Sequence, residues 1–277
     1  MASKRLRNRE FFEPAIEAVR RQQLPPARSI ALKQGVSTAA DSASATAISA
    51  PTTMCCVRKR PLLAKELDLK DYDVFTGSSE LSDITIVNDV DPSTSPPKDV
   101  TYTTSSIWAH KGEFKLDNKV MYLQHHGYRF HDVFVETDDS SVVYQRAIAH
   151  LVREQSSPTA DGRNLASVIF YGQSGSGKTY TQEAIVELSL RDMFADNRPD
   201  CEWSLSCYEI YADKVADLLQ ERAPVQLRQD AAGLIHAVGG SEHKLPSVEA
   251  ATALLAQASA LRATEVSLRS SVFLSGI

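Results

Sequence analysis

The sequence predicts an α/β fold with a central, mainly mixed β-sheet and helices on both of its faces. Short runs of β-branched and aromatic residues alternate along the chain with longer segments whose apolar residues recur at helical spacing. The clearest pair is a buried strand over residues 166–171 and a helix that runs from Thr179 towards Pro199. A chain of 277 residues, 43% of them hydrophobic, is long enough for one substantial core or two smaller ones.

The loop between that strand and that helix has the phosphate-loop pattern of glycine, four residues, then Gly-Lys-Thr. It consists of Gly172, Gln173, Ser174, Gly175, Ser176, Gly177, Lys178 and Thr179. Glycines permit backbone conformations in which successive N–H groups converge on a phosphate, and the helix adds the positive end of its dipole. Lys178 would neutralise the β- and γ-phosphates, and the Thr179 hydroxyl would bind Mg²⁺. The pattern predicts a P-loop NTPase; the alternative is a Gly/Ser-rich turn that binds nothing.

The sequence favours ATP over GTP as the nucleotide. A guanine-binding Asn-Lys-x-Asp motif is missing, because Asn118 and Lys119 are followed by Val120 and Met121. The expected cofactors are therefore ATP and Mg²⁺, held by the loop and the first turn of its helix.

Four motifs, in the same order along the chain, resemble those of kinesin motor domains. The segment Phe170–Thr181 resembles the kinesin phosphate loop, and Val57–Pro61 resembles the Arg-x-Arg-Pro segment that ends the first strand. Residues 130–134 resemble a Phe-Asp-x-Val-Phe strand, with His131 in place of the usual Asp. Residues 208–219 resemble the kinesin Tyr-Glu-Ile-Tyr and Asp-Leu-Leu motif.

This resemblance implies a kinesin-like central sheet and a microtubule-associated, ATP-binding motor whose partner is tubulin. It also implies that Arg58 and Pro61 flank the adenine ring and that Tyr180 belongs to the nucleotide site together with the loop. The expected location is the cytoplasm, on the microtubule cytoskeleton.

A finer resemblance is to kinesin-13, the internal-motor class that depolymerises microtubules. It rests on residues 57–62 and 108–111 and on a three-residue segment that corresponds to the Lys-Val-Asp finger of that class, formed by Lys115, Leu116 and Asp117. By resemblance these three residues would contact tubulin. The alternative is an ordinary charged hairpin tip.

The chain is expected to divide at residue 54. Residues 1–53 read as a basic helical stretch followed by a flexible linker rich in Ala, Ser and Thr, and residues 54–277 as a partial motor domain. The basic residues within positions 1–33 would steer the chain towards an acidic tubulin surface; the alternative is a solvated, frayed terminus.

The last residues depart from the kinesin pattern. Where kinesins carry Ser-Ser-Arg-Ser-His, residues 262–273 contain only Ser270 and Ser271 as a remnant, and no second switch precedes Ile277. Because the switches position the attacking water and hold the γ-phosphate, no complete catalytic set is expected in these residues. The motor fold is accordingly expected to be incomplete at its C-terminal end.

Two functions therefore stand side by side. The first is a kinesin-type ATPase that moves along or depolymerises microtubules. The second is a truncated, non-hydrolysing remnant that binds nucleotide or tubulin and is not a motor. Turnover distinguishes the two hypotheses.

Composition argues against several other classes of protein. The net charge of −5 gives no indication of nucleic-acid or membrane binding, and no apolar run reaches the roughly 18 residues that a bilayer requires. The four cysteines lack metal-like spacing and are expected to be reduced packing residues; they are Cys55, Cys56, Cys201 and Cys207.

The remaining segments give weaker signals. Helices are expected over 140–152 and over 247–262, the second capped by Ser247. A hairpin is expected from strands at 225–228 and 234–238, and loops at 91–97 and 156–162.

Overall fold

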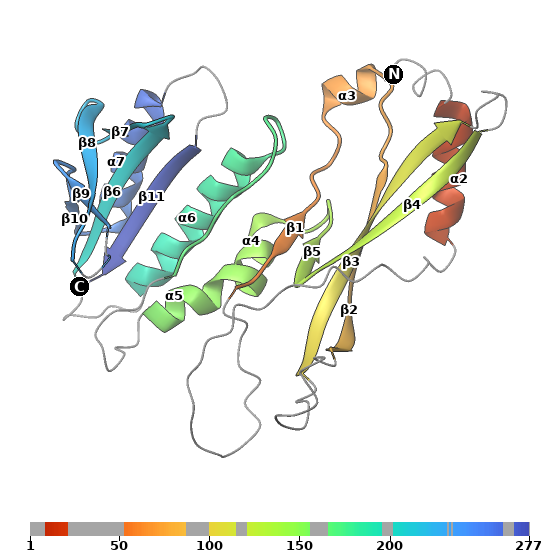
Figure 1. The fold of residues 1–277 in the computed structure, drawn as a ribbon, viewed down its shortest axis with the longest axis horizontal. Helices are drawn as coiled ribbons and strands as arrows, with labels where there is room; N and C mark the ends of the chain where they lie inside the picture. The colour runs from red at the N-terminus through yellow and green to blue at the C-terminus, as the bar shows by residue number, and fades with distance from the viewer. Residues whose placement is uncertain are drawn as a thin grey trace. The chain divides into compact units, whose positions relative to one another are not determined.

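The computed structural model describes residues 9–21, 53–86, 100–114, 121–155, 166–195, 202–231, 233, 235–262 and 269–276. The chain packs as two compact units, Met1–Asp139 and Ser140–Ile277, which are treated separately below (Figure 1). The predicted α/β class is confirmed, and the described strands form three sheets of two, three and six strands. No helix in the described ranges is long and apolar enough to cross a membrane.

The first unit is built on a three-stranded antiparallel sheet. Its strand order is β2-β3-β4, with bounds Phe75–Ile86, Val100–Phe114 and Met121–Phe130. Beside it, β1 (Cys56–Arg58) pairs in parallel with β5 (Asp132–Phe134). A short helix, α3 (Ala64–Asp68), follows β1.

His131 links the two strands of the parallel pair. Its Nδ1 accepts a hydrogen bond from the Cys55 backbone N–H at 2.9 Å, and its backbone N–H donates to the Cys55 carbonyl at 3.0 Å. The residue that stands in place of the usual kinesin Asp therefore aligns β1 with β5.

Helix α2 (Arg9–Arg21) packs against the three-stranded sheet, beside β4 (Figure 1). Phe12 and Ile16 are its buried residues, with 0% and 1% exposure. Gly112 of β3 makes room for the Phe12 ring, because a Cβ at that position would lie 2.8 Å from ring carbons. The helical part of the predicted basic segment is therefore a packed element and not a frayed end.

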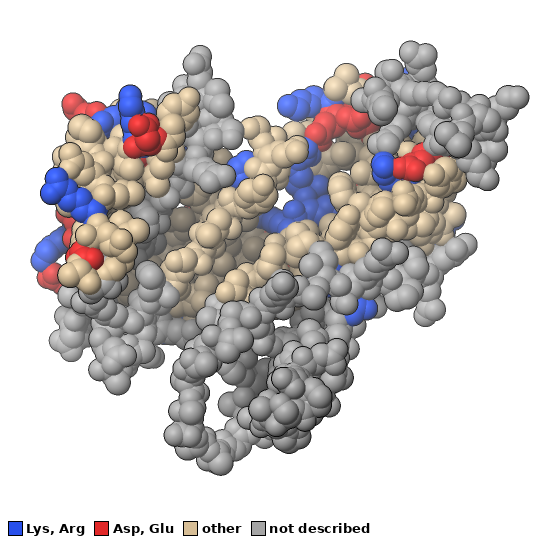
Figure 2. All heavy atoms as spheres, viewed as in Figure 1, with Lys and Arg blue, Asp and Glu red and all other residues tan. Residues whose placement is uncertain are grey.

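Several charges of the first unit are paired. Arg9 binds Glu13 at 2.6 Å, and Arg60 binds Glu66 at 2.6 Å. The hydrogen bond from Arg60, and a second from the Leu63 backbone, lower the pKa of Glu66 to about 2. Figure 2 shows some acidic side chains beside basic ones on the face drawn.

The second unit is organised around β6 (Trp203–Tyr211). Strand β11 (Arg269–Gly276) pairs antiparallel along nearly all of β6, while β10 (His243–Leu245) and β7 (Lys214–Asp217) pair with its two halves. The sheet continues from β7 to β8 (Ala223–Gln229) and β9 (Ile235–Val238). The predicted hairpin around residues 230–233 is therefore confirmed as β8–β9.

Three helical segments complete the second unit. The first runs continuously as α4 (Ser140–Val143), a π-helical turn η1 (Tyr144–Ile148) and α5 (Ala149–Gln155). The others are α6 (Lys178–Ala195) and α7 (Val248–Leu261). All three predicted helices are confirmed, as is the Ser247 cap, whose Oγ accepts from the Ala250 N–H at 3.3 Å.

The core of this unit lies between its sheet and the helices α6 and α7. Its buried members come from both layers and are Leu190, Leu205, Cys207, Leu218, Leu219, Leu245, Ala251 and Ala258. Burial raises the pKa of the Cys207 thiol to about 12, so this cysteine is the packing residue that was predicted. Cys56 is half-buried, whereas Cys55 is exposed and is not the packing residue that was predicted. Cys201 lies outside the described residues.

The strand predicted over residues 166–171 is the main difference from expectation. The segment is irregular and exposed: Ile169 is 87% and Tyr171 91% accessible. A strand is stabilised by the ladder it forms with a neighbour, and the described strands pair with one another and not with this segment. The loops predicted at 91–97 and 156–162 lie outside the described residues.

Removal of the Phe12 ring tests the packing of α2. The variant Phe12→Ala should lower the unfolding free energy by about 3–5 kcal/mol, because it leaves a cavity over Gly112. Chemical denaturation measures this change. The matched control is Phe11→Ala, whose side chain is 41% exposed and should cost far less. Equal losses in the two variants would contradict the described packing.

Two carboxylates are buried in the β6–β7–β8 meander. Asp217 is fully buried and accepts from the Leu219 N–H at 2.8 Å and from the Ser241 N–H and Oγ–H at 2.6 and 2.7 Å. Glu209 is 1% exposed and forms an ion pair with Arg222, whose backbone is left-handed with φ +64°. Both carboxylates belong to the motif at residues 208–219, and in this fold they hold turns together.

Neutralising Asp217 should destabilise the second unit. In Asp217→Asn an amide NH₂ replaces one acceptor oxygen and faces a donor, which should cost about 2–3 kcal/mol of unfolding free energy. Asp213→Asn, in the exposed β6–β7 turn, is the control and should be near neutral. An Asp217→Asn chain as stable as this control would refute the assigned hydrogen bonds.

Candidate nucleotide-binding site

The glycine loop adopts backbone conformations that favour glycine at three positions. The φ angles are +157° at Gly172, +78° at Gly175 and +92° at Gly177. Side-chain-bearing residues rarely adopt such angles, because the Cβ then clashes with the neighbouring carbonyl. The sequence prediction that these glycines shape the loop agrees with this backbone, which closes through a hydrogen bond from the Ser176 N–H to the Gln173 carbonyl at 3.1 Å.

Gly172 is also required for the close approach of the two sides of the loop. A Cβ at this position would lie 2.5 Å from Ser176 Oγ. The loop is thus too narrow at its base for a larger residue without a shift of Ser176.

Lys178 is the first residue of α6, and its side chain folds back over the loop. Its Nζ donates to the carbonyls of Gly172 at 2.7 Å and Gln173 at 2.8 Å. The first turn of α6 is fixed by Thr181, whose N–H and hydroxyl both donate to the Gly177 carbonyl, at 3.0 and 3.1 Å. An ammonium group and the N-terminus of an 18-residue helix therefore share one exposed loop, an arrangement suited to a polyphosphate.

Of the expected Mg²⁺ ligands, the chain supplies the Thr179 hydroxyl. Thr179 is exposed in the first helical turn, so its hydroxyl is accessible to a cation. In the part of the chain that is described, no group of three or more His, Cys, Asp or Glu side chains is arranged to hold a metal ion. Tyr180, next in sequence, is 67% exposed.

The other predicted site residues lie in the first unit or outside the description. Arg58 lies in β1 and donates from Nη2 to the Asp138 carbonyl at 3.3 Å, and Pro61 follows shortly after. Because the loop belongs to the second unit, the adenine-flanking role of Arg58 and Pro61 stays a prediction. The finger residues Lys115, Leu116 and Asp117 lie outside the described residues, between β3 and β4.

Comparison with known proteins identifies the family. The family model described as the kinesin motor domain matches residues 58–271. This chain belongs to the kinesin motor domain family. The match spans both units and includes the glycine loop, β6, β7 and most of the predicted site.

Two curated kinesins show the degree of similarity in sequence. The diatom spindle kinesin-1 of Cylindrotheca fusiformis is 28% identical over 212 residues, which cover 76% of this chain and 29% of the relative. The kinesin-like protein KIN-13A of Oryza sativa subsp. japonica is 27% identical over 215 residues, covering 75% of this chain and 22% of the relative. The chain thus spans less than a third of the length of these kinesins.

Solved structures show the same fold. The C-terminal motor and motor homology domain of Kar3Vik1, fused to a synthetic heterodimeric coiled coil, matches 74% of this chain and 49% of its own, with a TM-score of 0.53 and 23% identity. The KIF14 dimer in a two-heads-bound state, with AMP-PNP and in complex with a microtubule, matches 75% of this chain and 54% of its own. Its TM-score is 0.50 and its identity 21%. The kinesin motor fold predicted from the motifs is confirmed.

Proposed function

We propose that this kinesin-family chain binds Mg-ATP through the loop Gly172–Thr179 as part of a microtubule-associated motor. The observation that carries the proposal is the loop itself, in which three glycines with positive φ angles lead into Lys178 at the N-terminus of α6. The KIF14 structure of the same fold holds AMP-PNP and a microtubule, which supports both the ligand and the partner.

Each part of the loop has a distinct role in this proposal. Lys178 exchanges its two carbonyl partners for phosphate oxygens, and the N–H groups of the loop and of the first turn of α6 donate to the same phosphates. The Thr179 hydroxyl is a ligand to Mg²⁺, which neutralises phosphate charge when it is bound. The other residues of the loop contribute backbone N–H groups; they are Gln173, Ser174 and Ser176. Tyr180 lies beside the loop and is exposed.

The finer assignments extend the same proposal to the first unit. Arg58 and Pro61 flank the adenine ring, and Lys115, Leu116 and Asp117 contact tubulin. A place in the kinesin-13 class is supported by the sequence of residues 57–62 and 115–117 and by the similarity to KIN-13A. In that class the partner is the tubulin lattice, and the outcome is microtubule depolymerisation.

A second candidate function is nucleotide or tubulin binding without hydrolysis. It is favoured by residues 269–273, where Ser270 and Ser271 are not followed by the Arg-Ser-His of the kinesin switch. These residues form the edge strand β11 in register with β6, with Ser270 opposite Glu209. A loop that binds phosphates accelerates transfer only if other groups also orient the attacking water.

Lys178 tests the nucleotide proposal. The variant Lys178→Ala should weaken ATP binding by about ten- to a hundredfold, since it removes one charge-assisted contact to the phosphates. Isothermal titration with Mg-ATP measures the affinity. Lys214→Ala, an exposed lysine of β7 in the same unit, is the matched control and should bind as the natural chain does. Unchanged affinity in Lys178→Ala, or no binding by the natural chain, would refute the proposal.

Turnover in the same three proteins separates the two candidate functions. Phosphate release that rises on addition of polymerised tubulin, and is lost in Lys178→Ala, is the result expected of a motor. ATP binding without multiple turnover would instead establish the non-hydrolysing function.

A further inference from the structure

Two histidines face each other across β3 and β4 in the first unit. His110 and His125 are directly opposite in the antiparallel register, and their Nδ1 atoms are 2.8 Å apart. At this distance one Nδ1 carries the hydrogen and the other accepts it, so the pair shares a single proton. His110 is only 3% exposed, which makes a second proton costly.

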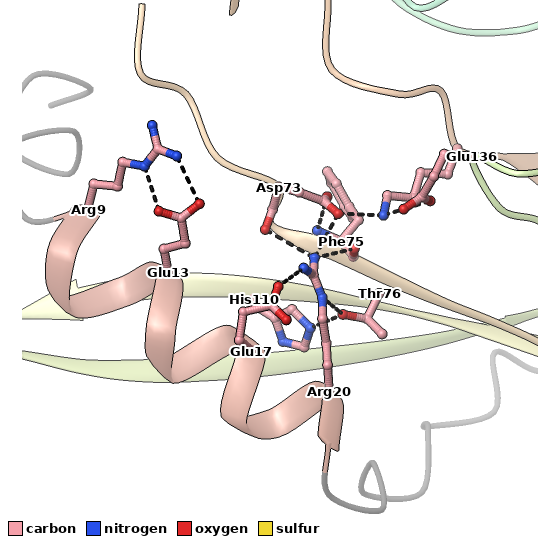
Figure 3. A network of polar contacts seen from close by, with 10 residues as sticks. Arg9, Glu13, Glu17, Arg20, Asp73, Phe75, Thr76, His110 and Glu136 are labelled. Carbon is pink, nitrogen blue, oxygen red and sulfur yellow. Dashed lines mark hydrogen bonds and ion pairs between the residues drawn. The ribbon is translucent and has the colours of Figure 1, made fainter. Parts of the chain in front are cut away.

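Hydrogen bonds connect His110 of this pair to helix α2 (Figure 3). The Thr76 hydroxyl of β2 lies 2.8 Å from His110 Nε2 and accepts from Arg20 Nε of α2 at 3.0 Å. Since Arg20 occupies a lone pair of Thr76, the Thr76 hydrogen is available to His110 Nε2. His110 then donates from Nδ1 to His125, and every member of the chain has a partner in one consistent tautomer.

Arg20 is itself held by groups at the start of β2. Its Nη2 donates to Asp73 Oδ2 at 2.7 Å and to the Phe75 carbonyl at 3.0 Å, and it forms an ion pair with Glu17. The same guanidinium therefore ties α2 to the sheet and orients the hydroxyl that contacts His110.

The charges around His110 come from every element that packs near it. Arg20 comes from α2, Lys59 and Asp73 from the segments beside β1 and β2, and His125 from β4. Burial has the largest effect, followed by His125 and Arg20, and together with Lys59 they lower the pKa of His110 to about 4 against the opposing effect of Asp73. Burial and then His126 also lower the pKa of His125.

The lysines near the histidine pair form ion pairs with carboxylates. Lys59 binds both Asp73 and Glu136, at 2.6 and 2.9 Å, and Lys111 binds Glu113 at 2.5 Å. The close positive charges of Arg20 and Lys59 therefore oppose a further proton on the pair, and Asp73 is shared between them.

We propose that the His110–His125 pair is a pH-sensitive latch that holds helix α2 on the three-stranded sheet and releases it on protonation. A second proton on His110 Nε2 removes the hydrogen bond that this nitrogen accepts from Thr76 and places a cation near Arg20, whereas a second proton on His125 Nδ1 breaks the hydrogen bond between the two imidazoles. Release of α2 exposes the pair to water and removes Arg20, so the released state takes up protons more readily.

The direction of the pH effect follows from the depressed pKa. Between about pH 6.5 and pH 4 the released state binds more protons than the docked state, so docking is complete above this window and weakens as the pH falls through it. Titration of His110 alone can lower the equilibrium constant for α2 docking by at most about 30-fold between about pH 7.5 and pH 5.

Hydrogen exchange on the full chain measures the docking directly. Protection factors of the α2 amides (residues 9–21), corrected for intrinsic exchange rates, should fall at least about fivefold from near pH 7.5 to near pH 5. Amides of β6 and β7 in the second unit serve as the internal reference and should change far less. A helix α2 that keeps its protection relative to this reference would overturn the latch.

Variants assign the effect to the pair. The double variant His110→Gln/His125→Asn has no titratable group at the pair and should leave α2 protection independent of pH, whereas His236→Gln, which removes an exposed histidine of β9, should behave as the natural chain does. A pH-dependent loss that persists in the double variant would contradict the proposal.

A reciprocal measurement keeps the proposal testable without any histidine substitution. If α2 docking depresses the pKa of His110, then Phe12→Ala, which loosens the helix, must raise it towards 6.5 in an NMR titration. The same pKa in the natural chain and in Phe12→Ala would show that the pair and the helix are not coupled.

Discussion

Pairing of β6 on both of its edges is the constraint on which the second unit depends. The strand has β11 along one edge and β10 and β7 along the other, and it buries Leu205 and Cys207 completely. Helix α6 packs into the same core through Leu190. Because α6 begins at Lys178, the strand that fixes this helix also fixes the end that carries the glycine loop. The site is therefore positioned by a rigid core, although the loop itself is exposed.

The buried polar side chains of the two units have different kinds of hydrogen-bond partners. In the second unit Asp217 is fully buried and accepts three hydrogen bonds, one from Leu219 and two from Ser241, which lies between β9 and β10. In the first unit the buried His110 is linked through Thr76 to Arg20, a residue of a distant helix. The first arrangement stabilises a turn through an aspartate, whereas the second depends on the protonation of an imidazole.

Local signals predicted the helices, the β8–β9 hairpin and the glycine loop, because caps, apolar periodicity and turn glycines are properties of neighbouring residues. Non-local contacts were beyond such signals. The segment 166–171 has the composition of a buried strand, but a strand also needs a partner, and Ile169 is exposed. The docking of α2 depends on the contact between Phe12 and Gly112, which are far apart in the sequence. No pattern within the helix predicts this contact. The inward fold of Lys178 was likewise not predictable, since it depends on the carbonyls of the loop.

The two hydrogen bonds of Lys178 have a consequence for selectivity. The cation of the loop has two oxygen partners within the loop itself, at 2.7 and 2.8 Å. An anion that binds Lys178 must displace these two carbonyls from its ammonium group. The affinity for the anion therefore reflects the difference between its contacts with Lys178 and the two hydrogen bonds that are lost. A ligand that offers a single phosphate replaces little more than it displaces, whereas a chain of phosphates offers oxygens to the lysine, the helix amides and a cation at once. On the proposed function, the loop would therefore favour ligands that present several acceptor oxygens together.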